Sequence, residues 1–104
     1  PLVVSQCFNL TDKSIKAVAA GCSSLTSLNV TCCGNLTDES IKAVAAGCGN
    51  SLASLNVSRC PNLTDESVKA VAAGCSSLGE FNIMGCSNIS YKTISAVKRS
   101  FPSL

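Results

Sequence analysis

Histidine and tryptophan are absent from this sequence, and aromatic residues of any kind are scarce, at 4% of the chain. Histidine is the side chain that most often acts as a general acid or base, and it is a common metal ligand. The sequence also has no glycine-rich phosphate loop, and its acidic residues do not converge with a nucleophile and a base. We therefore expect no catalytic, cofactor-binding or metal site, and no enzymatic activity.

Charge and long apolar runs are equally sparse. Eight lysines and arginines stand against six aspartates and glutamates, and a net charge of +2 is too small to point to nucleic acid. No apolar run reaches the ~18 residues that a membrane-spanning helix needs. Apolar residues nevertheless make up 46% of the chain, which is too many for a disordered protein. We expect one small folded domain with neither a nucleic-acid nor a membrane partner.

The chain is organised around an internal repeat. Leu25–Cys48 recurs as Leu52–Cys75, and only five of the 24 paired positions differ. More divergent copies flank this pair, which gives units at about 1–24, 25–51, 52–77 and 78–104. The first unit lacks a residue that matches Leu25, so we expect the domain to be a fragment of a longer array. Repeats of this length are typical of solenoids.

Each unit predicts a strand followed by a helix. Alternating apolar and polar residues in 28–31 favour a short strand with one buried face. Thr37 is a favourable helix N-cap, and Ile41 and Val44 fall on one apolar stripe of a helix of about two turns. We expect Gly47 to end that helix in the left-handed conformation. Such a short helix must be held by its neighbours.

The two ends of the repeat differ from its middle. The first unit begins inside a strand, whose uncapped edge predicts self-association. In the last unit, Ser90 and Tyr91 replace the Thr-Asp pair, and Lys98 and Arg99 replace two alanines. Divergence and added charge are typical of a terminal, capping repeat.

The recurring pattern L-x-x-L-x-V-x-x-C-x-N-L-T-D, closed by A-x-G-C, resembles the cysteine-containing leucine-rich repeats. These occur in ribonuclease-inhibitor-like arcs, in F-box substrate receptors and in plant hormone co-receptors. The resemblance covers essentially the whole chain, although no F-box-like segment is present in it. It implies an α/β fold, a solenoid arc of about four β–α repeats with parallel strands on the concave face and short helices on the convex face. It also implies a protein partner.

Eight cysteines invite three interpretations. A metal site would need closer spacing and usually histidine, and a disulfide between stacked cysteines would need side chains that do not run parallel. Buried free thiols fit the repeat best, and they imply a reducing, intracellular location. Cys32 falls outside the repeat and is expected to be exposed, on the opposite strand face from Cys33. The repeat-placed cysteines are Cys7, Cys33, Cys60 and Cys86 in one series and Cys22, Cys48 and Cys75 in another.

Two other recurring features have both a structural and a functional interpretation. The Asn-x-Ser/Thr sequons would accept glycans in a secreted protein, but Asn35 and its equivalents are expected to hydrogen-bond the turn backbone between repeats. Three pairs at i and i+4 would place opposite charges together on the convex face. These pairs are Asp12 with Lys16, Asp38 with Lys42, and Asp65 with Lys69.

The concave face is the remaining candidate for binding. It is either a polar recognition strip or a set of solvent-facing positions that contact nothing, and a specific site is expected where the copies differ, at Arg59, Glu80 and Met84. Stacked asparagines should form a ladder across it. The predicted partner-binding residues are Asn29, Thr31, Asn56, Ser58, Arg59, Glu80, Asn82 and Met84.

These observations favour a non-catalytic protein–protein interaction scaffold. Self-assembly as a structural scaffold, natural or built from consensus repeats, is an alternative from a different class. The substrate-recognition part of an F-box ubiquitin ligase and a secreted recognition protein are further alternatives.

Overall fold

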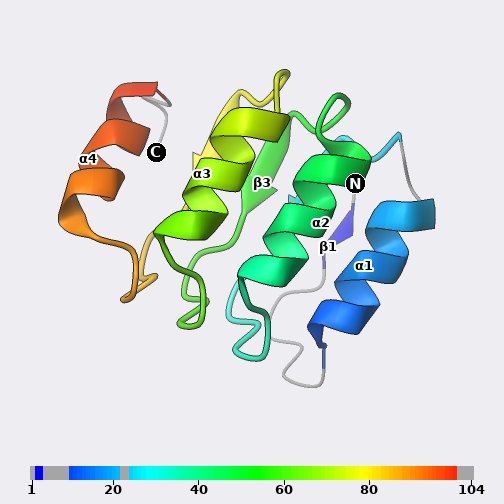
Figure 1. Cartoon of the computed structure of the whole chain (residues 1–104), viewed down its shortest axis with the longest axis horizontal. Helices are drawn as coiled ribbons and strands as arrows, with labels where there is room; N and C mark the ends of the chain where they lie inside the picture. Colours follow the sequence, from blue (N-terminus) through cyan, green and yellow to red (C-terminus); the bar gives the residue numbers. More distant parts are fainter. Residues whose placement is uncertain (1, 4–9, 22–23, 101–104) are drawn as a thin grey trace.

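The computed structural model describes residues 2–3, 10–21 and 24–100, and within these it alternates strands and helices. Cys7, Cys22 and the Asn9 sequon lie outside the described residues. The four strands form one sheet in the order β1-β2-β3-β4, and the helices lie side by side on one face of it (Figure 1). The elements are β1 Leu2–Val3, α1 Asp12–Gly21, β2 Ser27–Asn29, α2 Asp38–Cys48, β3 Ser54–Asn56, α3 Asp65–Gly74, β4 Glu80–Asn82 and α4 Tyr91–Ser100.

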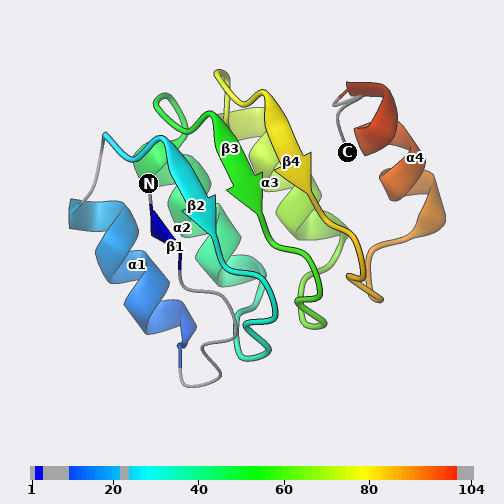
Figure 2. The same cartoon turned by 180° about the vertical axis from the view of Figure 1, so that it is seen from behind.

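The register of the sheet repeats the register of the sequence. Leu28 pairs with Leu2 on one side and with Leu55 on the other, and Leu55 pairs with Phe81, all in parallel strands. Seen from the sheet side, β2, β3 and β4 run alongside one another with the helices behind them (Figure 2). The expected leucine-rich-repeat arc of parallel strands and covering helices is therefore confirmed.

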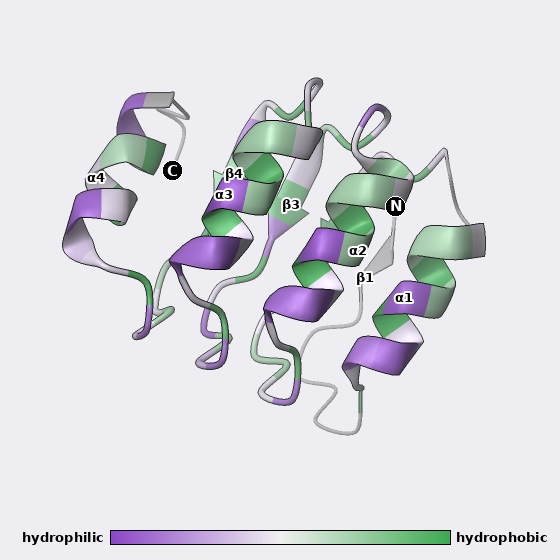
Figure 3. Cartoon of the chain, viewed as in Figure 1, coloured by the Kyte–Doolittle hydropathy of each residue, from purple (hydrophilic) through white to green (hydrophobic). Residues whose placement is uncertain are grey.

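The core lies between the sheet and the helix layer. Leu28 and Val30 on one unit, and Leu55 and Val57 on the next, are all at most 1% exposed. The hydrophilic first turns of α1, α2 and α3 line up along one edge of the molecule (Figure 3). Because each unit buries its apolar face against its neighbours, the core is continuous along the arc.

The helices are longer and closer together than the sequence suggests. They contain ten or eleven residues, roughly three turns rather than two. The prediction for Gly47 is wrong, because α2 continues through it to Cys48 and is followed by Gly49 at φ −59°. A Cβ at Gly47 would lie 2.5 Å from the carbonyl oxygen of Ala19. Glycine is needed there for close helix contact, not for a left-handed backbone.

This contact predicts an unusual response to a helix-favouring substitution. Gly47→Ala should destabilise the fold by about 1–3 kcal/mol, because the clash with α1 outweighs the gain of ~1 kcal/mol in helix propensity. Gly34→Ala is the matched control, since a Cβ there meets nothing within 4 Å. Urea unfolding of both variants measures the difference, and a Gly47→Ala protein at least as stable as the wild type would refute the close contact.

Candidate functional site

The side chains of the concave face are arranged in columns across the strands. The middle column consists of Asn29, Asn56 and Asn82, which are paired in register. The predicted asparagine ladder is thus present. The next column, two residues further along each unit, consists of Thr31, Ser58 and Met84.

The asparagine side chains close the turn that follows each strand. Oδ1 of Asn29 accepts hydrogen bonds from the backbone N–H and the hydroxyl of Thr31, at 3.0 and 2.6 Å. Asn56 accepts the same two bonds from Ser58, at 3.0 and 2.8 Å, and Asn82 accepts one from the N–H of Met84 at 3.0 Å. This is the local side-chain turn that asparagine favours. Each of these side-chain oxygens therefore stabilises the turn that follows its strand.

The residue after this column adopts a left-handed backbone in each of three units. Cys32 has φ 62°, Arg59 has φ 58° and Gly85 has φ 76°. The expectation that Cys32 and Cys33 lie on opposite faces of a strand is therefore wrong, because Cys32 lies in a turn. Non-glycine residues are uncommon at such angles and occur more often at functional positions. The sequence carried one signal for this conformation, which is the glycine in the fourth unit.

Arg59 and Met84 lie together at one end of the strip. A Cβ added to Gly85 would meet Cγ of Arg59 at 2.8 Å, so the Arg59 side chain crosses the residue next to Met84. Met84 is 67% exposed, and among the described residues only Tyr91 is a large hydrophobic side chain with comparable exposure. Glu80 is exposed too, but it begins β4 and lies at the opposite end of that strand. Of the three residues at which the repeats differ, the structure thus brings Arg59 and Met84 together and places Glu80 apart from them.

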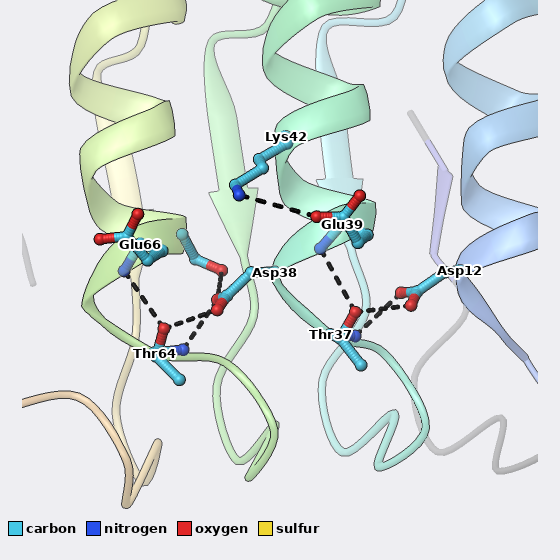
Figure 4. Close-up of polar contacts among 8 residues, drawn as sticks. Asp12, Thr37, Asp38, Glu39, Lys42, Thr64 and Glu66 are labelled. Atoms are coloured by element: carbon cyan, nitrogen blue, oxygen red, sulfur yellow. Dashed lines mark hydrogen bonds and ion pairs between the residues drawn. The ribbon is translucent and has the colours of Figure 1, made fainter.

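A second recurring cluster joins the starts of the helices, and we call it the aspartate ladder: Asp12, Asp38 and Asp65. The carboxylate of Asp12 accepts hydrogen bonds from the N–H of Thr37 at 2.9 Å and from its hydroxyl at 2.6 Å (Figure 4). It also accepts one from the hydroxyl of Ser40. Asp38 binds Thr64 and Ser67 in the same way. Each aspartate therefore fixes the helix start of the following unit.

Threonine completes each start within its own unit. Oγ1 of Thr37 accepts a bond from the N–H of Glu39, and Oγ1 of Thr64 accepts one from the N–H of Glu66, which confirms the predicted N-cap role (Figure 4). In the fourth unit Asp65 still accepts a bond from the N–H of Ser90 at 2.9 Å. Threonine is thus both an acceptor within its helix and a donor to the preceding unit.

The structure corrects the predicted charge pairs in part, since Lys16 and Lys69 still help to lower the pKa of Asp12 and Asp65 by charge attraction. Lys42 pairs with Glu39 at 3.6 Å and Lys69 pairs with Glu66 at 3.2 Å, so glutamate at i−3 is the acidic partner. Asp38 binds the next unit instead. Both ion pairs are solvent-exposed, and such pairs contribute little to stability. A carboxylate beside serine and threonine hydroxyls can suggest catalysis, but these hydroxyls are donors to a structural acceptor.

The hydrogen bonds shift the acid strength of the ladder. Burial alone raises the pKa of the Asp38 carboxyl, but the hydrogen bonds from Ser67 and Thr64 outweigh it and hold the pKa below its ordinary value. The pKa of Asp12 is lowered in the same way, against its burial, by Ser40 and Thr37. The backbone N–H of Ser90 is the main cause of the lowered pKa of Asp65.

Asp38→Asn should lower the free energy of unfolding at pH 7 by about 2 kcal/mol, because it weakens three charge-assisted hydrogen bonds. A folded-state pKa below the unfolded value of ~3.9 contributes stability above that value and loses it as pH falls through the folded pKa. Wild-type stability should therefore drop below about pH 4, and more steeply than that of Asp38→Asn.

Glu39→Gln is the matched control for this measurement, because Glu39 is adjacent and forms only an exposed ion pair. It should change stability by less than about 0.5 kcal/mol. Equal losses in the two variants, measured by denaturant titration at pH 7 and pH 3, would contradict the structural role of the ladder.

None of the described cysteines forms a disulfide, and all of them except Cys32 are buried. Sγ of Cys60 donates to the carbonyl oxygen of Val30 at 3.2 Å, and Sγ of Cys86 donates to that of Val57 at 3.1 Å. A small apolar side chain with a weak donor thus satisfies a carbonyl of the preceding unit. Burial raises the pKa of Cys60 to about 11, and it also raises that of Cys86. Within the described ranges no group of three or more histidine, cysteine or acidic residues could hold a metal ion.

These environments predict the order of thiol reaction. Among the described cysteines, iodoacetamide at pH 7.5 under native conditions should label Cys32 first and leave Cys33, Cys48, Cys60 and Cys86 unmodified, because only a thiolate that the reagent can reach reacts quickly. Peptide mass mapping of native and urea-unfolded samples gives the order. Labelling of Cys60 as fast as that of Cys32 would show that the core thiols are accessible.

The predicted turn role of Asn35 is confirmed at its equivalents. Nδ2 of Asn62 donates to the carbonyl oxygen of Gly34 at 2.6 Å, and Nδ2 of Asn88 donates to that of Pro61 at 2.5 Å. Each bond joins a turn to the turn of the preceding unit. These side chains therefore stabilise the stacking of the repeats.

A sequence model of the leucine-rich repeat matches residues 21–45 and 50–72, which cover most of the second and third units. The fold is a leucine-rich-repeat arc. Proteins built from this repeat generally bind other proteins and are typically non-catalytic. A search of curated proteins finds no match to the chain. In the part of the chain that the structure describes, no helix is long and apolar enough to cross a membrane.

Proposed function

We propose that this leucine-rich-repeat chain is a non-catalytic scaffold that binds another protein through its concave face. The observation that carries the proposal is the pairing of exposed Met84 with Arg59, whose backbone is left-handed. Neither residue is required by the repeat, since the matching positions hold threonine or serine and cysteine or glycine. Methionine and arginine are both enriched at protein interfaces.

The polar residues of the concave face have a smaller part in this proposal. Asn29, Asn56 and Asn82 use their side-chain oxygens in turns. Ser58 is only 9% exposed, and its hydroxyl lies 3.3 Å from that of Thr31. Small polar groups that are already hydrogen-bonded make weak binding hot spots. Specificity for the protein partner should therefore depend on Arg59, Met84 and Glu80. The asparagine amides should contribute only weak polar contacts.

We further propose that the repeats belong to the cysteine-containing, ribonuclease-inhibitor-like class. The support is the recurring thiol-to-carbonyl bond of Cys60 and Cys86, which gives the cysteine a defined place between units. Buried thiols in this arrangement are suited to a reducing compartment. An intracellular location follows from that proposal.

Photo-crosslinking from the two faces tests the scaffold proposal. A photoreactive phenylalanine analogue at Asn56 on the concave face should crosslink a protein partner in a cell extract, and the same group at Lys69 on the convex face should not. Alanine at Arg59, Glu80 and Met84 together should reduce the Asn56 adduct at least about tenfold, since loss of interface anchors costs ~1–2 kcal/mol or more.

The matched control is a triple alanine variant of Lys42, Glu66 and Lys69 on the convex face, which should leave the Asn56 adduct unchanged. Equal crosslinking from both faces, or an adduct unaffected by the Arg59, Glu80 and Met84 changes, would reject the concave face as the binding surface.

A further inference from the structure

The last unit leaves a cavity of about 270 Å³ between the end of β4 and α4. We call it the end cavity. A cavity of roughly 150 Å³ can hold benzene, so this one is large enough for a leucine or phenylalanine side chain. It is smaller than most small-molecule sites, which begin at about 300 Å³. Its lining residues are Ile83, Met84, Gly85, Ile94 and Lys98.

The end cavity lies at the repeat position where, in earlier units, the apolar side chains pack against the following unit. Ile15 and Ile41, at the position of Ile94 in the first and second units, are each 1% exposed, whereas Val68 at the same position of the third unit is partly buried. Ile94 is only partly buried. The apolar surface that is buried between the first units is thus partly open at the last unit.

The free edge of β4 offers hydrogen bonds beside this cavity. Within the arc, the N–H of Val57 donates to Asn82 at 2.9 Å and the N–H of Arg59 donates to Met84 at 2.8 Å. The matching donors on β4 are the N–H groups of Ile83 and Gly85. No residue in the described ranges accepts a hydrogen bond from either group. Open backbone groups of this kind bind an added strand.

Another leucine-rich unit, including one from a second copy of the chain, does not fit this end. Gly47 packs against Ala19 and Gly74 packs against Ala45, where added Cβ atoms would lie 2.5 Å and 3.0 Å from their nearest neighbours. Lys98 takes the place of those alanines, so a helix cannot approach α4 as closely. Tyr91 replaces the ladder aspartate and is 83% exposed, so it cannot fix the start of a following helix. An extended segment without a helix avoids both obstacles.

Charge defines the chemistry of that segment. Residues 81–104 contain no aspartate or glutamate, but they contain Lys92, Lys98 and Arg99. In α2 and α3 the exposed lysines pair with glutamates, whereas α4 has Lys92 at the glutamate position. None of the three cations of α4 forms an ion pair with a described residue. The occupant should therefore be acidic.

We propose that an extended, acidic peptide segment of a protein partner binds the end of the arc. It adds to β4 as a fifth strand by accepting hydrogen bonds from Ile83 and Gly85. One of its apolar side chains fills the end cavity, and a neighbouring carboxylate approaches Lys98. This inference rests on the proposed scaffold function, because Met84 belongs both to the concave face and to the cavity.

A synthetic probe tests the inference on the full chain. Acetyl-Glu-Asp-Leu-Glu-Asp-amide, titrated into the ¹⁵N-labelled protein, should shift the amide signals of Ile83, Gly85 and Ile94 saturably. Two control peptides, one with glycine in place of leucine and one with lysines in place of the acids, should bind about tenfold more weakly. Lys98→Glu should weaken the acidic peptide by about tenfold, whereas Lys42→Glu on the convex face should leave its affinity unchanged.

Several results would overturn the proposal. These are no saturable shift, shifts centred away from the cavity, equal binding of the three peptides, or no effect of Lys98→Glu. Binding only after removal of residues 101–104 would identify the chain's own end as the occupant. Peptide-free dimerisation that Lys98→Glu abolishes, seen by sedimentation, would identify a second copy.

The two proposals can fail separately. If the peptides do not bind but the Asn56 adduct still depends on Arg59 and Glu80, the end-cavity inference is wrong and the concave-face proposal stands. If the peptides bind as expected but Asn56 gives no adduct, the cavity is a binding site and the concave strip is not.

Discussion

The bond between one unit's aspartate and the next unit's helix start is the interaction on which the arc depends. A helix of ten or eleven residues is only marginally stable by itself in water. Asp12 and Asp38 supply acceptors for the backbone N–H of Thr37 and Thr64, and these threonines in turn cap their own helices. The apolar face of each helix then lies over the sheet in register with its neighbour. Helix formation in one unit and the stacking of that unit on its neighbour are thus coupled.

The same coupling explains why most of the repeat is unavailable for binding. Cys60 and Cys86 satisfy carbonyls of the preceding unit, and Asn62 and Asn88 join neighbouring turns. Gly47 and Gly74 allow the helices to touch. Substitution of any of these residues would weaken the packing of one repeat on the next. Recognition is left to positions that the repeat does not constrain, such as Arg59 and Met84, and to the end of the arc.

Much of this fold was predictable because its local and repeated signals agree. The alternation around Leu28 defined the buried strand face, and Thr37 marked a helix start that the structure confirms. The errors concern contacts between units. Gly47 looks like a helix end until Ala19 is placed beside it, and Asp38 looks like a partner for Lys42 until Thr64 is placed beside it. The end cavity likewise depends on how the last unit packs, whereas the left-handed turn at Cys32 was signalled by the glycine at its position in the fourth unit.

The aspartate ladder also gives the chain a polarity. Each carboxylate belongs to one unit but accepts the hydrogen bonds of the helix start in the unit that follows it. A substitution of Asp38 should therefore first loosen the start of α3, one repeat away from the altered residue. Substitutions along the aspartate ladder should thus loosen segments one unit nearer the C-terminus than the altered residue, whereas Cys60 and Cys86 act on the unit before them.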